Sequence, residues 1–442
     1  MSTGIVATAS LILLLVLIMA GVHLSTSLMF ASILGVFLTT GRFSTAMNVL
    51  AQSAWGQVRS YMFGVIPLFV LMGLLANLSG ASKDLYDAAS LLLKRVRGGV
   101  AIATVVANAI FAAITGVTVA SAAIFTKIAL PQMTRLKYDR RFALGTIAGS
   151  AILGMLIPPS LLMIVYGSQA DVSIGKLFVG AVLPGIVMTA AFIVVVLMMG
   201  KFKPDYIPEV QALTDEEQAN FWRVVLKPWP IVLLIIISLG GIWLGFFTPT
   251  EAGGVGAFGA FLIVVFKGKF NLKDFSSTLI ESGSTAGSVL ILMVSASTYS
   301  KMLSMCGVIN VIRSFVESIN VAPIVVILVF IAILMALGCI LDSTSILLLT
   351  TPLMCPVVAD LGFDMVWFGI VMIIAIETGM ITPPFGMNVF TVKSSVYGME
   401  GMDNITVNDI FAGSTPFLLA MVVVDLLCVF VPQMITLLPA MM

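Results

Sequence analysis

Long apolar runs recur from one end of the chain to the other, and short polar segments separate them. The uninterrupted runs cover residues 5–22, 25–39, 61–79, 176–199, 228–247, 250–266, 283–302 and 410–438. An α-helix needs about 20 mostly apolar residues to cross the hydrocarbon core of a bilayer. Runs of this length are typical of membrane spans, so the pattern predicts an all-α polytopic membrane protein.

Two further apolar stretches, residues 140–170 and 365–397, are each interrupted by a pair of prolines. The first pair ends the run Gly154-Met155-Leu156-Ile157-Pro158-Pro159, and the second ends Gly379-Met380-Ile381-Thr382-Pro383-Pro384, 225 positions later. A Pro-Pro pair cannot continue a helix, because both N–H donors are missing and the rings clash with the preceding turn. In a bilayer such breaks are tolerated only where the freed backbone groups are buried in protein or line a cavity. Paired breaks in two halves of a chain indicate the binding site of a secondary transporter.

The similarity between the halves extends well beyond these two sextets. At the same offset a proline, two aromatic residues and an aspartate recur: Pro131 and Pro356, Tyr138 and Phe363, Asp139 and Asp364, Phe142 and Trp367. A chance match over about 30 residues would not preserve proline and aromatic positions together. We interpret the pattern as an internal duplication.

Composition supports the membrane assignment and excludes several classes of function. Hydrophobic residues make up 60% of the 442 positions and charged residues only 10%, with a mean hydropathy of +1.15, whereas a soluble domain carries about 25% charged residues. The expected environment is therefore the lipid bilayer, and a net charge of +1 gives no reason to expect a nucleic-acid partner. A single histidine and four scattered cysteines offer no catalytic triad and no transition-metal or disulfide spacing.

A third kind of interruption predicts a hairpin in each half. Residues 99–131 are apolar but broken at Thr115-Gly116, and basic residues flank them on both sides: Lys94, Arg95, Arg97, Arg135, Lys137, Arg140 and Arg141. Both ends should face the cytoplasm, because Lys and Arg concentrate on that side. A segment with both ends on one side is a re-entrant hairpin. Two short spans joined at the break are the alternative, although each would have only about 15 residues where about 20 are needed.

The same reasoning predicts an inverted-topology repeat with the N-terminus in the periplasm. An odd number of crossings per half turns the second half over, so its hairpin at 322–358 enters from the outside, and that hairpin lacks a basic cluster. We expect scaffold segments, two repeats of a transport block and a polar cytoplasmic linker. In chain order these are 1–60 (scaffold), 61–199 (first block), 200–227 (linker), 228–282 (scaffold) and 283–442 (second block).

The four breaks should meet near the middle of the membrane and form the binding site. Hydroxyls, freed carbonyls and carboxylates are hard oxygen ligands that suit a small cation, and half-helix C-termini add carbonyl dipoles. The candidate sodium ligands are Thr115, Gly116, Thr118, Gly154, Pro158, Asp342, Ser345, Gly379 and Thr382. Half-helix N-termini offer N–H donors to an anion. The candidate substrate residues are Ser121, Pro159, Ser160, Pro384, Gly386 and Asn388.

Three acidic residues leave more than one role open. Asp342 lies at the tip of the second hairpin, where it could ligate an ion, cap the following helix arm, or do both. Glu377 directly precedes the second Pro-Pro run and is either an ion or proton site or a contact to freed backbone. Glu251, in Thr248-Pro249-Thr250-Glu251, is most simply explained as a helix cap.

Several of these runs together resemble the large membrane subunit of TRAP (tripartite ATP-independent periplasmic) transporters. The resemblance is carried by the Gly-x-x-Ile-Pro-Pro-Ser run at 154–160, Tyr166-Gly167, the Thr-Pro-Pro-x-Gly run at 382–386 and the Thr-Pro-Thr-Glu-Ala run at 248–252. It covers nearly the whole chain. One departure is at the first hairpin tip, where the family usually has Ser-Gly-Ser-Ser and this chain has Thr115-Gly116-Val117-Thr118, which leaves one hydroxyl fewer.

The resemblance implies an elevator-type fold, similar to the ion transporter superfamily, in the bacterial inner membrane. It also implies import of a small organic acid driven by Na+, with about two coupling ions and no organic cofactor. Two partners are implied, a small four-helix membrane subunit and a periplasmic substrate-binding protein.

Two other functions remain as alternatives. A stand-alone sodium- or proton-coupled organic-anion symporter would share the architecture but need no binding protein. A polytopic membrane enzyme would need a clustered catalytic set, against which the single His23 argues. No Walker phosphate loop is present in the sequence, so nothing indicates ATP use.

Overall fold

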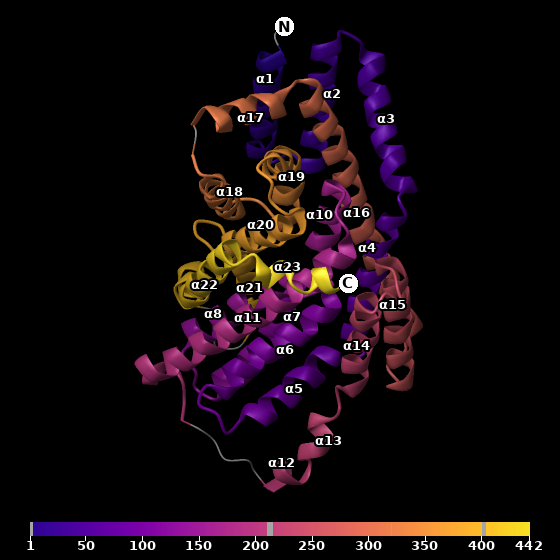
Figure 1. The fold of residues 1–442 in the computed structure, drawn as a ribbon. Helices are drawn as coiled ribbons and strands as arrows, with labels where there is room; N and C mark the ends of the chain where they lie inside the picture. The colour runs from indigo at the N-terminus through magenta and orange to yellow at the C-terminus, as the bar shows by residue number, and fades with distance from the viewer. Residues whose placement is uncertain (1–2, 210–214, 320, 400–403) are drawn as a thin grey trace.

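The chain folds into helices, as expected from its apolar pattern (Figure 1). The structure is a computed structural model, and it describes residues 3–209, 215–319, 321–399 and 404–442. Within these ranges all regular structure is helical, and eight helices are long and apolar enough to cross a membrane: Tyr61–Leu78, Arg140–Ala170, Ile174–Phe202, Phe221–Trp243, Pro249–Phe266, Leu272–Met305, Ser343–Asp360 and Val407–Phe430. The predicted all-α polytopic class is confirmed.

One group of helices packs together beside the hairpins. It contains α1 (Thr3–Met19), α2 (Leu24–Thr40), α3 (Phe43–Arg59), α4 (Val65–Leu78), α14 (Trp229–Trp243), α15 (Pro249–Phe266) and α16 (Leu272–Met305). Helices α1 to α3, α14 and α15 fall in the predicted scaffold segments, whereas α4 and most of α16 fall in segments predicted for the transport blocks. Glycines let these helices approach closely, since a Cβ at Gly35 would meet Met302 at 2.8 Å and one at Gly256 would meet Met72 at 2.3 Å. The glycine-rich run 254–259 therefore serves helix packing.

Helix α16 differs from the sequence-based division of the chain. In the sequence the apolar run begins at residue 283, after a scaffold segment that ends at 282, whereas α16 is one helix of 34 residues that passes through this boundary. No proline interrupts it. Its hydroxyls bond back to carbonyls of the same helix, as Thr278 and Thr285 do at 2.8 and 3.0 Å, so polar residues are accommodated without a break.

The second group contains the hairpins and the broken helices. In the first half these are α6 (Gly99–Thr115), α7 (Thr118–Arg135), α8 (Arg140–Ala151), α9 (Leu153–Leu156), α10 (Leu161–Ala170) and α11 (Ile174–Phe202). In the second half they are α18 (Pro323–Gly338), α19 (Ser343–Asp360), α20 (Met365–Gly379), α21 (Met387–Val396) and α22 (Val407–Phe430), followed by α23 (Gln433–Thr436). The order hairpin, broken helix, long helix therefore occurs twice.

The duplication extends to individual contacts. Asp139 caps α8 and Asp364 caps α20, and each accepts a hydrogen bond from the backbone N–H three residues later, at 2.9 and 2.8 Å. The ring before each aspartate stacks on the ring three residues after it, with centroids 6.4 Å apart in the first half and 5.1 Å in the second. The predicted internal repeat is thus visible in geometry as well as in sequence.

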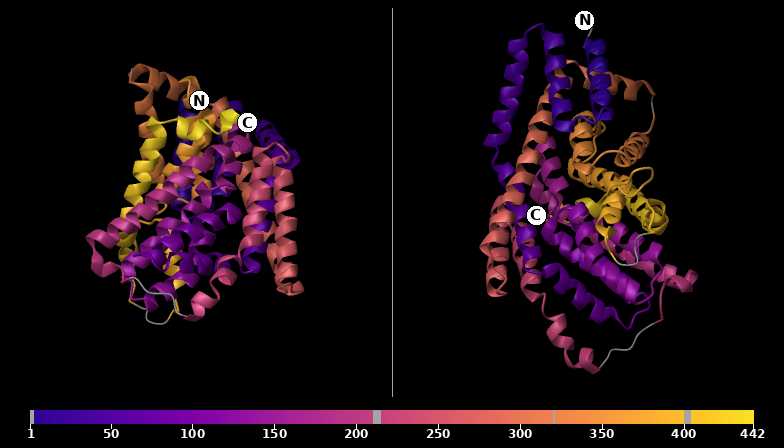
Figure 2. Two further views of the ribbon diagram at one scale, coloured as in Figure 1. Left: turned by 60° about the horizontal axis from the view of Figure 1, so that its bottom comes forward. Right: turned by 180° about the vertical axis from the view of Figure 1, so that it is seen from behind.

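The polar linker lies at the end of the molecule opposite α1 (Figures 1 and 2). It contains α12 (Asp215–Ala219) and α13 (Phe221–Val225), while 210–214 lie outside the described residues. Helix α5 (Ala81–Leu93) packs against α13. Asp84 of α5 forms ion pairs with Lys227 at 2.7 Å and Lys267 at 2.5 Å, which connects the linker, α5 and the end of α15.

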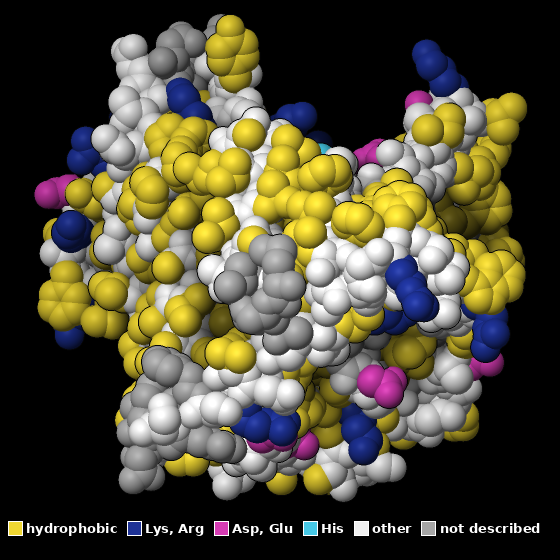
Figure 3. Space-filling model, turned by 90° about the horizontal axis from the view of Figure 1, so that it is seen from above, with side chains coloured by type: hydrophobic (Ala, Val, Ile, Leu, Met, Phe, Trp, Pro, Cys, Tyr) yellow, Lys and Arg dark blue, Asp and Glu magenta, His cyan; other side chains and the backbone are white. Residues whose placement is uncertain are grey.

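The face seen from above is apolar over wide areas, with Lys and Arg in separate groups (Figure 3). Phe246, Phe266 and Leu272, near the ends of α14 to α16, expose 75%, 83% and 73% of their surface. Many other large apolar side chains are exposed as well, which is unusual for a monomer surrounded by water. This surface is suited to contact with lipid or with another membrane subunit.

The Asp84 ion pairs generate a test of how the linker is held. Burial raises the pKa of Asp84, but the hydrogen bonds and charges of Lys227 and Lys267 outweigh it, so the net pKa lies below the ordinary 3.8. The pairs therefore stabilise the fold fully above pH 3.8, and the contribution is lost as the pH falls through the lowered native pKa. We expect Asp84→Asn to lower the thermal midpoint at pH 7 by about 1–2 °C, since each of the two partly exposed pairs contributes up to about 1 kcal/mol and a chain of this length shifts by about 1 °C per kcal/mol.

Asp87→Asn is the matched control on the same helix. Burial raises the pKa of Asp87, so removal of its charge should not lower the midpoint. Thermal unfolding of the purified protein in detergent measures both variants. Equal midpoints for wild type and Asp84→Asn at pH 7 would contradict a stabilising role for the pairs.

Candidate functional site

The tip of the first hairpin docks onto the first Pro-Pro break. The backbone N–H of Leu161, at the start of α10, donates to the carbonyl of Gly116 at 3.2 Å. Gly116 has a left-handed backbone with φ of 62°, and a Cβ there would stand 2.5 Å from the carbonyl oxygen of Pro159. Only glycine meets both conditions. Gly154, on the other side of the break, similarly lies against Val117 and Thr118.

The second hairpin docks onto the second break in the same way. The N–H of Gly386 donates to the carbonyl of Cys339 at 3.3 Å, and Gly386 follows Leu161 by the same 225 positions that separate the repeats. Gly379 lies so close to Gly338 that a Cβ on Gly379 would be 2.6 Å from the Cα of Gly338. Each hairpin tip therefore supplies a carbonyl to the helix that restarts after the prolines. Both Pro-Pro peptide bonds are cis.

Glu377 connects the two hairpins. Its side chain is 1% exposed, and its two carboxylate oxygens accept hydrogen bonds from Thr118 Oγ1 at 2.8 Å and Ser343 Oγ at 2.6 Å. Thr118 begins the second arm of the first hairpin, and Ser343 begins the second arm of the other. No Lys or Arg forms an ion pair with Glu377 among the residues described. The predicted convergence of the hairpin tips is therefore realised around this carboxylate.

Asp342 has a different environment from the one that its sequence position suggested. Its side chain is exposed, and it caps α19 by accepting hydrogen bonds from the backbone N–H of Ser345 at 3.0 Å and from the Ser345 hydroxyl. Of the two roles left open, the cap is the one visible in the structure. Similarly, Glu251 and Thr248 form a reciprocal capping box at the start of α15, as expected.

Several candidate substrate residues present buried polar atoms without a protein partner. Ser121 and Asn388 are completely buried, and neither Ser121 Oγ nor Asn388 Oδ1 has a hydrogen-bond partner. Asn388 Nδ2 donates to the carbonyl of Ala148 at 2.5 Å. Asn108 of α6, which sequence reasoning missed, has the same property, because its Nδ2 donates to Ser150 at 2.7 Å and its Oδ1 has no partner. Each unsatisfied buried group costs about 1–3 kcal/mol, which a ligand or water can relieve.

The remaining candidates are less closely associated with this region. The hydroxyl of Thr115 donates to the carbonyl of Phe111 in its own helix at 3.2 Å, and the hydroxyl of Thr382, which lies in the break, donates to the carbonyl of Thr378 near the end of α20 at 2.8 Å. Ser160 caps α10 and donates to the carbonyl of Met155 at 2.5 Å. Pro158 and Pro159 are buried, whereas Pro384 is exposed. The first break is therefore enclosed and the second is open.

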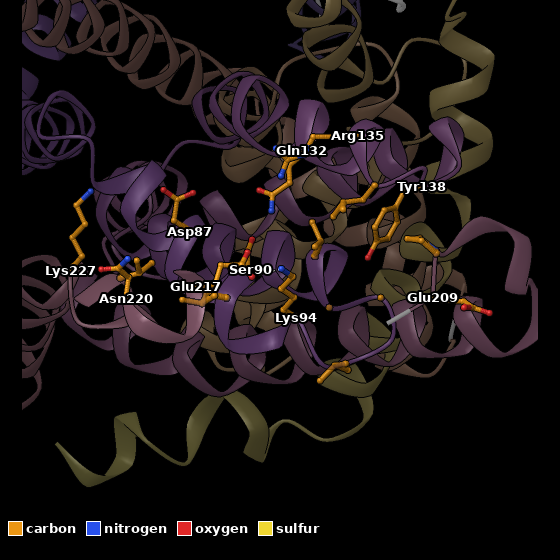
Figure 4. Close-up of a pocket in the computed structure, with 18 of the residues that line it drawn as sticks. Asp87, Ser90, Lys94, Gln132, Arg135, Tyr138, Glu209, Glu217, Asn220 and Lys227 are labelled. Atoms are coloured by element: carbon orange, nitrogen blue, oxygen red, sulfur yellow. Dashed lines mark hydrogen bonds and ion pairs between the residues drawn. The ribbon is translucent and has the colours of Figure 1, made fainter. Parts of the chain in front are cut away.

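A cavity of about 630 Å³ lies elsewhere, between the linker and the ends of the first hairpin (Figure 4). Gly99 and Val100 at the start of α6 line it together with Gln132 and Arg135 at the end of α7. Both ends of this hairpin therefore line one cavity, while the side of the membrane that they face stays a prediction. None of the candidate site residues lines the cavity, so it is separate from the docked breaks.

The chain is similar to known proteins over nearly its full length. Residues 11–434 match the family model described as tripartite ATP-independent periplasmic transporter, DctM component. The C4-dicarboxylate TRAP transporter large permease protein DctM of Pseudomonas aeruginosa is 32% identical, over 86% of each chain. The sialic acid TRAP transporter large permease protein SiaM of Vibrio cholerae is 28% identical, over 96% of each.

Two solved structures share the fold. The YdaH transporter of Alcanivorax borkumensis has a TM-score of 0.62 at 13% identity, covering 88% of this chain and 89% of its own. MtrF of Neisseria gonorrhoeae has a TM-score of 0.56 at 14% identity, covering 89% and 85%. At this level of identity, the similarity concerns the fold alone.

The docked tip of the first hairpin gives a prediction with a matched control. Gly116→Ala introduces a left-handed alanine and a Cβ 2.5 Å from Pro159, whereas Gly41→Ala introduces the same backbone cost at φ of 70° with no atom within 4 Å. Both should lose about 1–2 kcal/mol of stability through the backbone, and Gly116→Ala should lose a further 1–3 kcal/mol, roughly, through the clash. Chemical or thermal unfolding in detergent measures the difference. Equal losses would mean that the tip does not dock on the break.

Proposed function

The chain belongs to the DctM component family of tripartite ATP-independent periplasmic transporters, and we propose that it is the sodium-coupled subunit that imports a small organic acid. The observation that carries the proposal is the pair of hairpin tips docked on two helix breaks, beside buried polar atoms that lack a protein partner. This is the arrangement expected where irregular backbone forms a site inside a membrane.

The chemistry around the breaks is suited to sodium. Hydroxyl, carbonyl and carboxylate oxygens are available there, and a buried carboxylate without a Lys or Arg partner favours a cation nearby. We propose that the ions are held by the tip and break residues already named, which include Thr118, Gly154 and Gly379, with about two ions per cycle. Asp342 stays a candidate ligand, because an N-cap retains free carboxylate lone pairs.

An organic anion is suited to the other face of the breaks. Helices α10 and α21 begin directly after the Pro-Pro pairs, so their N-terminal N–H groups and dipoles attract a carboxylate. Ser121, Ser160 and Asn388 are the polar side chains we propose for its recognition, together with Pro159, Pro384 and Gly386. The relatives named for C4-dicarboxylates and sialic acid are consistent with this class of substrate.

We further propose how the chain is oriented in the bacterial inner membrane and which part of it moves. The N-terminus lies in the periplasm and the linker in the cytoplasm, which agrees with their positions at opposite ends of the molecule (Figure 1). The hairpins and broken helices move as an elevator against the scaffold helices. Family membership supports a small four-helix membrane subunit and a periplasmic substrate-binding protein as partners.

The first test of this function is sodium dependence. Two sodium ions entering with one monoanion carry one net charge, worth about 2.3 kcal/mol per 100 mV, and two tenfold gradients add about 1.4 kcal/mol each. The total of roughly 5 kcal/mol supports accumulation on the order of several thousandfold. We expect uptake into proteoliposomes that contain the chain, the small subunit and the binding protein to stop when choline replaces sodium.

The same vesicles separate the proposal from its nearest alternative. Sodium-driven uptake by this chain alone, without the binding protein, would indicate a stand-alone symporter. Uptake that continues unchanged in choline would contradict sodium coupling altogether.

The Pro-Pro breaks give a second test of this function. Replacement of Pro158 and Pro159 by alanine, or separately of Pro383 and Pro384, allows the helix to continue and removes the half-helix ends. We expect both double variants to insert and fold, as measured by size-exclusion chromatography, but to lose transport. The control is the double replacement of Pro131 and Gln132 by alanine. Both residues lie near the far end of α7, away from the hairpin tip, so this variant should retain uptake. Near-normal uptake by either break variant would show that the breaks are not the site.

A further inference from the structure

We infer that Glu377 is a positioning residue that couples the two hairpin tips, so that sodium binding at one tip favours sodium binding at the other. The inference rests on the proposed function and adds a residue through which its two halves communicate. It starts from the two hydrogen bonds at 2.8 and 2.6 Å that Glu377 accepts from Thr118 and Ser343.

The two donors hold equivalent positions in the duplicated fold. Ser343 follows Thr118 by 225 residues, the offset that relates the two Pro-Pro runs, and each is the first residue of its helix. Thr118 and Ser343 are 0% and 3% exposed, so neither hydroxyl can replace its hydrogen bond to Glu377 by one to bulk water. Glu377 thus accepts one hydrogen bond from each repeat.

The acceptor itself has no counterpart in the other half. The residue 225 positions before Glu377 is Ile152, which is 1% exposed and apolar. A symmetric pair of carboxylates would allow each hairpin to bond within its own repeat. A single carboxylate forces both hairpins to share one acceptor, so the halves are linked at a point where the duplication is broken.

Sharing one buried carboxylate makes the positions of the tips interdependent. A carboxylate that loses one of its two donors inside a protein keeps the full cost of its desolvation, and a hydrogen bond to a charged group is among the stronger ones. Displacement of either tip therefore leaves the carboxylate poorly satisfied unless the other tip compensates. An energetic link of this kind acts in both directions.

The tips also carry the backbone and side-chain oxygens proposed for sodium. Gly116 lies two residues before Thr118, and Asp342 directly precedes Ser343. An ion that fixes one tip therefore fixes one hydroxyl on Glu377, which restricts the carboxylate and with it the second hydroxyl. Positive cooperativity in sodium activation follows from this geometry.

The experiment is a double-mutant cycle measured in two backgrounds. Thr118→Val and Ser343→Ala are made singly and together, first with Glu377 intact and then with Glu377→Leu, in proteoliposomes with both partner subunits. The quantity compared is the half-saturating sodium concentration. With Glu377 intact, its change in the double variant should differ at least fivefold from the product of the changes in the two single variants. With Glu377→Leu, this departure should disappear and the Hill coefficient for sodium should fall toward one.

Conservative variants distinguish coupling from a merely structural contact. Ser343→Thr keeps the hydroxyl at the second tip and should retain the wild-type sodium curve and Hill coefficient. Thr118→Ser keeps the hydroxyl that bonds Glu377, so it should retain the Hill coefficient, whereas half-saturating sodium is not compared for this variant because Thr118 is itself a proposed sodium ligand. Sodium-dependent shifts of the thermal midpoint in detergent give a second readout that does not require transport. If Glu377→Leu does not fold, the cycle with Glu377 intact and the conservative variants still decide the question.

The outcomes separate the inference from the function on which it rests. Sodium-driven uptake in which Thr118→Val and Ser343→Ala act independently would overturn the coupling role of Glu377 and leave the proposed function standing. The same holds if the cycle is unchanged by Glu377→Leu. Uptake and thermal midpoints that ignore sodium in the wild type would overturn the proposed function, and the inference with it.

Discussion

The backbone groups released at the two helix breaks are the constraint on which the structure depends. A helix that stops inside a bilayer leaves N–H and C=O groups that water cannot reach, and each would cost several kcal/mol, roughly, if left unpaired. The hairpin tips meet this demand, because Gly116 and Cys339 offer carbonyls to the restarting helices. The close glycine contacts at Gly154 and Gly379 follow from the same requirement, since the tip must come within reach of the break.

Much of this arrangement could be predicted from the sequence because its causes are local. The conformational effect of a proline pair, a glycine at a hairpin tip or an apolar run depends on the residues of that segment alone. The duplication repeated each of these patterns in the second half. Charge placement predicted that both ends of the first hairpin face the cytoplasm, and the structure brings these two ends together at one cavity beside the linker. The length of α16 was not predictable in this way, because serine and threonine near its start look like a surface segment, although they bond within the helix.

The candidate site was less predictable because it depends on contacts between residues far apart in sequence. Asp342 is the obvious acid at a hairpin tip, yet it caps α19 and is exposed. Glu377 lies in an apolar helix whose neighbours give no sign of polar contact, and its partners are 259 and 34 residues away. Its position before the second Pro-Pro run marked Glu377 as a candidate, but only the spacing of Thr118 and Ser343 pointed to its partners. Asn108 gave no signal at all, since its burial follows only from how α6 packs on α8.

The unbroken length of α16 has a consequence for the membrane around it. At 1.5 Å per residue, its 34 residues extend for about 51 Å, while the hydrocarbon core is only about 30 Å thick. Its first turns carry Lys273, Asp274 and Glu281, which belong among headgroups and water. The helix is therefore long enough to reach from the aqueous boundary through the full hydrocarbon layer, and it contacts α2, α3, α4 and α19. Because the length of this unbroken helix is fixed, the thickness of the surrounding lipid must adjust to it.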